Sequence, residues 1–178
     1  MDPSIQLLFD EHDIIVKALG HVKSLNDLLP SGEEEYLANA RVLLAFFRDY
    51  GDKFHHHKEE VILFPEMEKK NEILGMGVLQ EMLENHADFR LMLKEVEQHL
   101  DKKEHQLAQR VFERYSEALL DHIAVENDEV FQMAEALFNP QELDRIYYQF
   151  QDCDRELGTD KKLQLAKQLD GLRKETNR

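Results

Sequence analysis

The chain is poor in the residues that interrupt helices and in those that build disulfide frameworks. Its 178 residues include only 7 glycines, 4 prolines and 1 cysteine. Few glycines and prolines favour a small number of long elements, and the many Leu, Glu, Lys, Gln and Ala residues favour helices. No run of alternating β-branched residues is bounded by turn signals, so we predict no sheet. Because the single cysteine, Cys153, cannot form an internal disulfide, we expect a reducing, cytoplasmic location.

Basic residues are scarce relative to acidic ones. The 22 Lys and Arg residues face 37 Asp and Glu residues, which gives a formal net charge of -15 at pH 7. An acidic surface repels phosphate backbones and anionic lipid, so we expect no nucleic-acid partner and no membrane partner. The sequence also lacks a long apolar run and a basic, apolar leader, so we expect no transmembrane span and no signal peptide.

Helix signals divide most of the chain into four long helices. The expected helices run from about Pro3 to Leu29, from Ser31 to about Pro65, from Val78 to Leu100 and from about residue 104 to Leu137. The breaks between them are Pro30-Ser31-Gly32, Leu74-Gly75-Met76-Gly77 and the polar turn Asp101-Lys102-Lys103. Because short turns join long helices, we predict an all-α fold, an up-down-up-down four-helix bundle with one or two extra C-terminal helices.

The pattern separates a bundle of residues 1–138 from a C-terminal helical extension of residues 139–178 packed on it. Asn139 as N-cap, Pro140 at the first helical position and Glu142 at the third mark the start of a fifth helix. These capping signals are the clearest helix start in the chain.

A sixth helix is expected after Gly158, from Thr159 to about Lys174. Its leucines form only a weak apolar stripe. The sequence leaves open whether this stripe packs on the bundle, on a partner protein or on a second copy of the chain in a homodimer.

Two histidine-glutamate pairs, His55/Glu59 and His122/Glu126, share a spacing of four residues. Four residues are about one helical turn, so each pair projects from one face of its helix. In both helices that face also carries the apolar residues, and a carboxylate in a protein core is costly unless a cation meets it. The two pairs therefore indicate a metal site.

Helical phase adds one histidine from each of the other two long helices, because His12 and His86 lie on the apolar stripes. At about 1.5 Å per residue, antiparallel packing brings all these groups to a similar height. We therefore predict a metal site formed by His12, His55, Glu59, His86, His122 and Glu126. Imidazole and carboxylate ligands without thiolate fit iron, manganese or zinc, and six ligands suit two metal ions bridged by carboxylates.

The run His55-His56-His57 leaves a choice of register. The column through His55 is apolar, whereas the column through His56 and Glu60 is mostly polar. We assign His55 with Glu59 to the site and keep His56 with Glu60 as the phase-shifted alternative. His57 is expected at the rim.

The remaining histidines fail the same test of phase. His21 is half a turn out of phase with His12. His99 and His105 flank a polar turn, so we expect both on the surface.

Taken together, these motifs resemble the haemerythrin (HHE cation-binding) domain family, bacterial type. The resemblance covers about residues 4–155 and rests on Glu11-His12-Asp13, on HHHKEEVILFP from His55 to Pro65, on Glu84-Asn85-His86 and on DHIAVEND around His122 and Glu126. It implies a four-helix bundle holding two iron ions, Fe2+ or Fe3+, with an oxo or hydroxo bridge. Carried over residue by residue, it assigns His12 and His55 to one iron, His86 and His122 to the other, and the bridge to Glu59 and Glu126.

The third helix departs from the pattern of oxygen-carrying haemerythrins, which have His-x-x-x-His there. The residue four after His86 is Arg90, and no replacement imidazole is evident. The resemblance then implies that the iron of His86 and His122 has fewer protein ligands, with solvent completing its coordination. For Arg90 the sequence leaves three roles open: orienting a bound anion, pairing with a bridging glutamate, or lying on the surface.

The resemblance implies a non-haem di-iron protein that binds O2, NO or iron itself for sensing, storage or stress response. The alternative is a di-iron enzyme acting on peroxide or nitric oxide, or in repair of iron-sulfur centres. A third is a regulatory module that binds a partner protein and uses the metal to stabilise its fold. No acid-base group beyond the ligands is evident in the sequence, which favours binding over catalysis.

Overall fold

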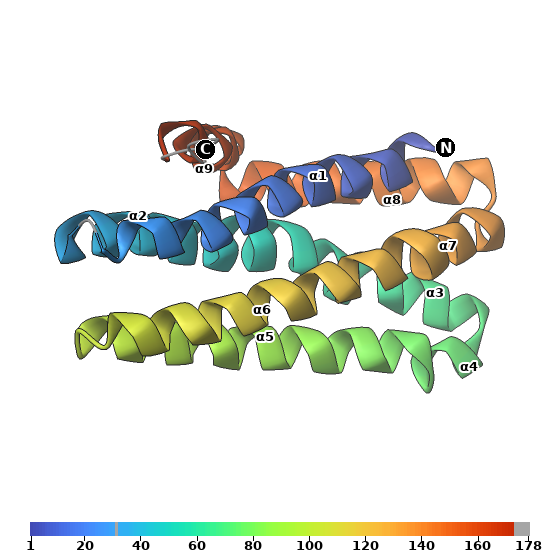
Figure 1. The fold of residues 1–178 in the computed structure, drawn as a ribbon. Helices are drawn as coiled ribbons and strands as arrows, with labels where there is room; N and C mark the ends of the chain where they lie inside the picture. Colours follow the sequence, from blue (N-terminus) through green and yellow to red (C-terminus); the bar gives the residue numbers. More distant parts are fainter. Residues whose placement is uncertain (31, 173–178) are drawn as a thin grey trace.

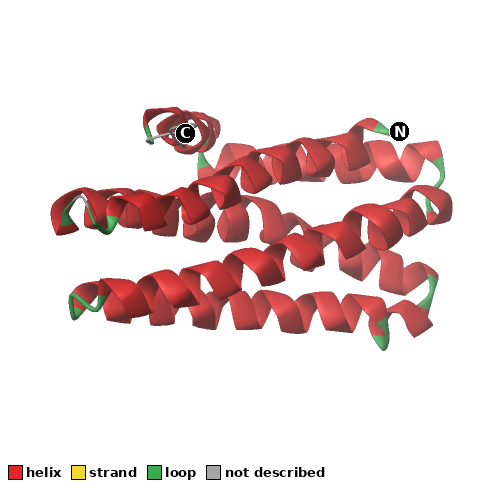
Figure 2. Cartoon of the chain, viewed as in Figure 1, coloured by secondary structure: helices red, strands yellow, loops and turns green. Residues whose placement is uncertain are grey.

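Apolar residues recur with a helical period along the chain, and the computed structural model forms helices accordingly. It describes residues 1–30 and 32–172, and within these ranges every regular element is a helix (Figures 1 and 2). Ser31 and the expected helix end near Lys174 lie outside the described residues. Four rods make up the bundle: α1 (Pro3–Ser24) with η1 (Leu25–Leu28); α2 (Glu33–Phe46), η2 (Phe47–His56), η3 (Glu59–Leu63) and α3 (Phe64–Lys70); α5 (Val78–Asp101); and α6 (His105–Val125), η4 (Glu126–Val130) and α7 (Phe131–Leu137).

The rods run alternately in opposite directions, with the short α4 (Glu72–Gly75) between the second and third (Figure 1). The predicted all-α bundle is confirmed. The second rod continues past its expected end to Lys70, because Pro65 lies in the first turn of α3, where a missing N–H is tolerated. Within the described part of the chain, no helix has both the length and the apolar character needed to cross a membrane.

The C-terminal part adds a fifth long helix, α8 (Pro140–Leu157), which packs beside α1 (Figure 1). Its predicted capping box is present, since Asn139 and Glu142 cap each other's backbone N–H groups. Gly158 has a φ of +102°, a conformation that favours glycine, and there the chain turns into α9 (Thr159–Gln168), followed by η5 (Leu169–Gly171). Helix α9 contacts α2 and η2. The leucine stripe of the last helix packs on the bundle through Leu165, Leu169 and Leu172.

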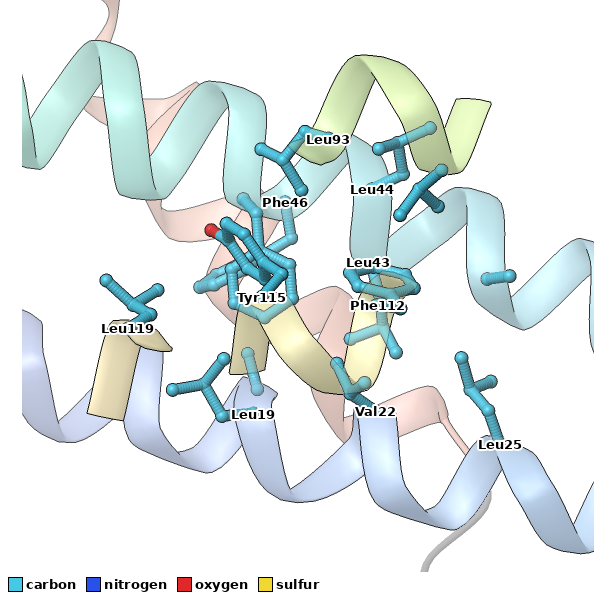
Figure 3. Close-up of a cluster of buried hydrophobic side chains, with 14 of the residues drawn as sticks. Leu19, Val22, Leu25, Leu43, Leu44, Phe46, Leu93, Phe112, Tyr115 and Leu119 are labelled. Atoms are coloured by element: carbon cyan, nitrogen blue, oxygen red, sulfur yellow. The ribbon is translucent and has the colours of Figure 1, made fainter. Parts of the chain in front are cut away.

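A polar layer divides the apolar core into two clusters. The larger cluster fills the end of the bundle around Phe112 and Tyr115 (Figure 3), and the smaller fills the other end. Along α1, His12 lies between Leu8 of the smaller cluster and Ile15 of the larger. The interior therefore holds one level at which polar side chains replace hydrocarbon.

This polar layer coincides with π-helical backbone. The second rod is π-helical in η2 and η3, and the fourth in η4. Glu59 is the first residue of η3, and Glu126 is the first residue of η4. In a π-helix each N–H bonds to the fifth residue back instead of the fourth, which widens the turn, and such segments occur often at functional sites. The widened turn lets neighbouring residues face inward together.

Candidate metal centre

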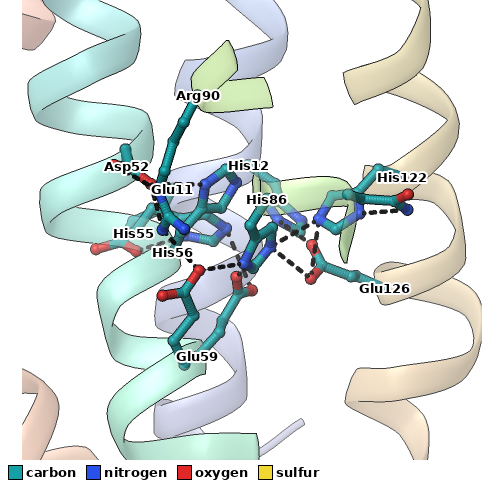
Figure 4. A network of polar contacts seen from close by, with 12 residues as sticks. Glu11, His12, Asp52, His55, His56, Glu59, His86, Arg90, His122 and Glu126 are labelled. Atoms are coloured by element: carbon teal, nitrogen blue, oxygen red, sulfur yellow. Dashed lines mark hydrogen bonds and ion pairs between the residues drawn. The ribbon is translucent and has the colours of Figure 1, made fainter. Parts of the chain in front are cut away.

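All six predicted ligands meet in the polar layer, and they form two groups with one further histidine. Within each group, one ligand atom from every member lies within 4.8 Å of the others. The first group is His12, His55, Glu59 and Glu126, and the second is His56, His86 and His122. All seven side chains are buried and come from the four rods of the bundle (Figure 4).

His56 is the residue that α-helical phase places wrongly. That phase assigns it to a polar face, but in the structure only 3% of His56 is exposed. The reason is the wide turn of η2, which turns both His55 and His56 toward the core. The His56 ring stacks on His86, with centroids 3.8 Å apart. The choice between His55 and His56 is therefore not exclusive, and Glu60 does not join either group.

The two buried glutamates each span both groups. One oxygen of Glu59 lies 3.3 Å from Nε2 of His55, and the other lies 3.6 Å from Nε2 of His86. One oxygen of Glu126 lies 3.3 Å from Nε2 of His12, and the other lies 3.2 Å from Nε2 of His122. Each carboxylate thus offers one oxygen to each group.

Six of the inner atoms of this layer have no hydrogen-bond partner among the described residues. They are both carboxylate oxygens of Glu59, both of Glu126, and Nε2 of His12 and His55. Buried carboxylate oxygens without partners carry a large desolvation cost, because nothing replaces their water. The donor set is imidazole nitrogen and carboxylate oxygen, which suits a transition metal ion. The residues present therefore fit a pair of metal cations.

The outer nitrogen of each histidine, Nδ1, faces a polar side chain. His55 contacts Glu11 at 2.8 Å, His86 contacts Glu60 at 2.8 Å, and His12 contacts Asn127 at 2.7 Å. The other two contacts are longer, from His56 to Asp52 at 3.4 Å and from His122 to Asn85 at 3.3 Å. Partners of this kind fix the ring so that Nε2 points inward, as in metal-bound histidines.

Charge in the layer is unevenly distributed. Burial disfavours the charged form of His55, but Glu59 and Glu11 outweigh it and raise the pKa of His55 to about 10. Burial also disfavours ionised Glu126, yet the adjacent imidazoles of His122 and His12 hold the pKa of this carboxyl well below its usual range. The Glu126 carboxylate is thus held in its charged form and attracts positive charge, which protons or metal ions can supply.

A family model decides what this arrangement belongs to. The model of the Hemerythrin HHE cation binding domain matches residues 4–134. The chain belongs to the haemerythrin family. No curated protein and no solved structure matches it. The matched residues include all seven buried side chains of the two groups, whereas α8 and α9 lie beyond the matched range.

The extra imidazole changes the balance of the haemerythrin site. With His56 included, the group of His86 and His122 has three imidazoles, and the group of His12 and His55 has two. The resemblance seen in the sequence implies the opposite, a deficit beside His86, because Arg90 stands where oxygen-carrying haemerythrins have a histidine. In the structure, His56 of the second rod lies beside His86 and His122, and the group with fewer imidazoles is that of His12.

The ion pairs of Arg90 are with Asp52 and Glu60, and not with Glu59 or Glu126. Its guanidinium donates to Asp52 at 2.9 Å and to Glu60 at 2.6 Å, and 42% of the side chain is exposed. These two carboxylates face Nδ1 of His56 and of His86. Arg90 therefore binds together the outer partners of two histidines (Figure 4).

The remaining histidines of the haemerythrin chain stay outside both groups. His57 is exposed, and His99 contacts Glu104 near the surface. His21 is buried away from the site, toward Leu25 and Leu43 at the other end of the bundle. His105 is 7% exposed and packs against Tyr36, so the expectation that it lies on the surface is wrong. Its place at the first position of α6 turns it toward α2.

A surface cleft reaches the layer between α5 and α6. It has a volume of about 270 Å³, and its lining includes His122, Asn85 and Ala118. His122 itself is only 2% exposed, so this side chain separates the cleft from the inner atoms. The cleft therefore ends at a member of the second group.

Proposed function

We propose that this haemerythrin-type domain holds two iron ions and uses them to bind a small ligand such as O2 or NO. One ion would take His12 and His55, and the other would take His56, His86 and His122. Glu59 and Glu126 would each give one oxygen to each ion. Bound as a ferrous pair, the two ions would supply the electrons that a diatomic ligand needs in order to bind reversibly.

The observation that carries the proposal is the position of the two glutamates between the two groups of histidines. Each carboxylate has one oxygen directed to each group, at 3.2 to 3.6 Å from the nearest imidazole nitrogens. A site for one ion would leave one group of nitrogens without a role. Two divalent cations also offset the two buried negative charges, which hydrocarbon neighbours cannot do.

The unequal number of imidazoles directs the small ligand to one side. Iron accepts up to six ligands, and the chain offers five beside His86 but four beside His12. The open positions therefore belong mainly to the ion of His12 and His55. On that side the Phe131 ring stacks on His12, with centroids 5.2 Å apart, and it keeps water away from the imidazole.

The test is the absorption spectrum of the protein loaded with Fe2+ under anaerobic conditions. We expect a new near-ultraviolet and visible spectrum on exposure to O2, and a different one on exposure to NO. Absence of any spectral change with either gas would contradict the proposal. Turnover of peroxide or NO at enzymatic rates would instead assign the enzymatic alternative.

A further inference from the structure

Behind His55 lies a buried network of four charged side chains. Glu11 accepts from Nδ1 of His55 through one oxygen, at 2.8 Å. Through its other oxygen it accepts from Lys58 at 2.7 Å and from Lys162. Both lysines also contact Asp154, Lys58 at 2.6 Å and Lys162 at 2.5 Å. The two ammonium groups therefore lie between the same two carboxylates.

This network is built into the protein interior. Lys58 is fully buried, Glu11 is 3% exposed and Asp154 is 7% exposed. Taking four charges out of water is costly, and the cost is offset only when every charge meets an opposite one. Here each ammonium contacts both carboxylates, and Lys58 also donates to the backbone oxygen of Phe54 at 2.8 Å. The formal charges of the four groups sum to zero.

Half of the network comes from outside the part of the chain that the family model matches. Glu11 and Lys58 belong to the bundle, but Asp154 lies on α8 and Lys162 lies on α9. The turn at Gly158 brings these two residues onto the same carboxylate and ammonium pair. Through Lys162, the C-terminal helices thus contact Glu11, which is the outer partner of the proposed ligand His55.

We infer that Asp154 and Lys162 are positioning residues of the metal centre, which set how strongly His55 holds its ion. This inference rests on the proposed di-metal function. A carboxylate that accepts from Nδ1 makes the imidazole a stronger ligand at Nε2. Lys162 neutralises part of the Glu11 charge, so it weakens the effect of Glu11 on His55. Asp154 pairs with both lysines and reduces their effect on Glu11, so it strengthens the effect of Glu11 on His55.

The inference predicts effects of opposite sign. In Lys162→Met, Glu11 loses one cation, so its carboxylate bonds His55 more strongly and the site binds a divalent ion more tightly. In Asp154→Asn, the lysines act on Glu11 alone, so the site binds the ion more weakly. If Asp154 and Lys162 only held α9 in place, both substitutions would weaken metal binding.

Lys161 provides a matched control on the same helix. It is adjacent to Lys162, contacts Asp49 at 3.0 Å and is half exposed, and it has no contact with Glu11. Lys161→Met removes one positive charge and one ion pair from α9 and leaves the network in place. Lys162→Arg keeps the positive charge and should preserve the affinity of the wild type.

The experiment is a titration of metal-free variants of this chain with Zn2+ in competition with a chromophoric chelator. For one of the two ions, we expect the affinity to rise about threefold to thirtyfold in Lys162→Met and to fall by a similar factor in Asp154→Asn. Lys161→Met and Lys162→Arg should stay within about twofold of the wild type. Thermal unfolding of each metal-free variant verifies that it is folded.

Shifts in the same direction for Lys162→Met and Asp154→Asn would overturn the inference, as would an affinity of Lys162→Met equal to that of Lys161→Met. In both cases the wild type would still bind two ions, and the proposed function would stand. A wild type that binds no Zn2+ would overturn both the proposed function and this inference.

Discussion

His55 and His56 are adjacent in the chain, and both rings are buried in the same polar layer, yet they belong to different ligand groups. Their ring centroids lie 5.6 Å apart, at an interplanar angle of 53°. An α-helix would rotate one of the two rings about 100° away from the other. The π-helical turn of η2 keeps both inside, so one rod gives an imidazole to each proposed ion.

His56→Ala should abolish tight binding of one ion and leave the other. Loss of an outer partner alone costs about 10–100-fold in metal affinity, so loss of a direct ligand should cost more than about 100-fold. His57→Ala is the matched control, because His57 is the next residue and is exposed. Isothermal titration with Zn2+ measures both. Equal stoichiometry in the two variants would show that His56 is no ligand.

Glu59→Gln and Glu126→Gln should remove the thermal stabilisation that metal gives. At a free metal concentration of about 100 Kd, binding stabilises the folded state by about 2.7 kcal/mol. For a chain of this length that corresponds to a rise in Tm of about 5–10 °C. A neutral amide cannot offset a cation or bridge two of them, so the rise should disappear. Glu129 is exposed and lies on η4, the π-helical segment that also holds Glu126. Glu129→Gln should keep the metal-dependent rise in Tm.

Arg90→Met should weaken binding of the ion beside His86 by about threefold to tenfold, less than the loss of a direct outer partner costs. Asp52 and Glu60 would lose the cation that holds them together, while His56 and His86 stay in place. Arg48→Met is the control, since Arg48 makes a paired contact of 2.7 Å with Glu97 and touches no partner of a ligand. Chelator competition should separate the two variants, and identical affinities would contradict the role given to Arg90.

Ala118→Phe should slow the loading of metal without changing the final affinity. Ala118 lines the cleft that ends at His122, and a phenyl ring there would fill part of its 270 Å³. Ala87→Phe places the same ring on an exposed position of α5 outside this lining. Stopped-flow absorbance during Fe2+ loading measures the rate. If the two variants load equally fast, the ion enters by another path.

Much of the fold follows from local signals in the sequence. The capping box at Asn139 and the break at Gly158 fix the fifth helix, and the apolar stripes fix the four rods. His12, His86 and His122 lie on α-helical turns, where a period of 3.6 residues places them correctly.

His56 lies on a π-helical turn, and such a change of period is not visible in helical phase. The available signal was Arg90, because the coordination position that it leaves open beside His86 can be filled by an imidazole from another helix as well as by solvent. The outer partners Glu11, Asn85 and Asn127 flank proposed ligand residues in the sequence, but which ring each one contacts depends on the neighbouring rod. The contact of Lys162 with Glu11 joins residues 151 positions apart and follows from tertiary packing alone.

The central claim is that one chain holds two metal ions between Glu59 and Glu126. The most direct measurement is the iron content per chain after anaerobic loading with Fe2+ and removal of free metal by gel filtration. We expect two iron ions per chain. A value of one or of zero would contradict it.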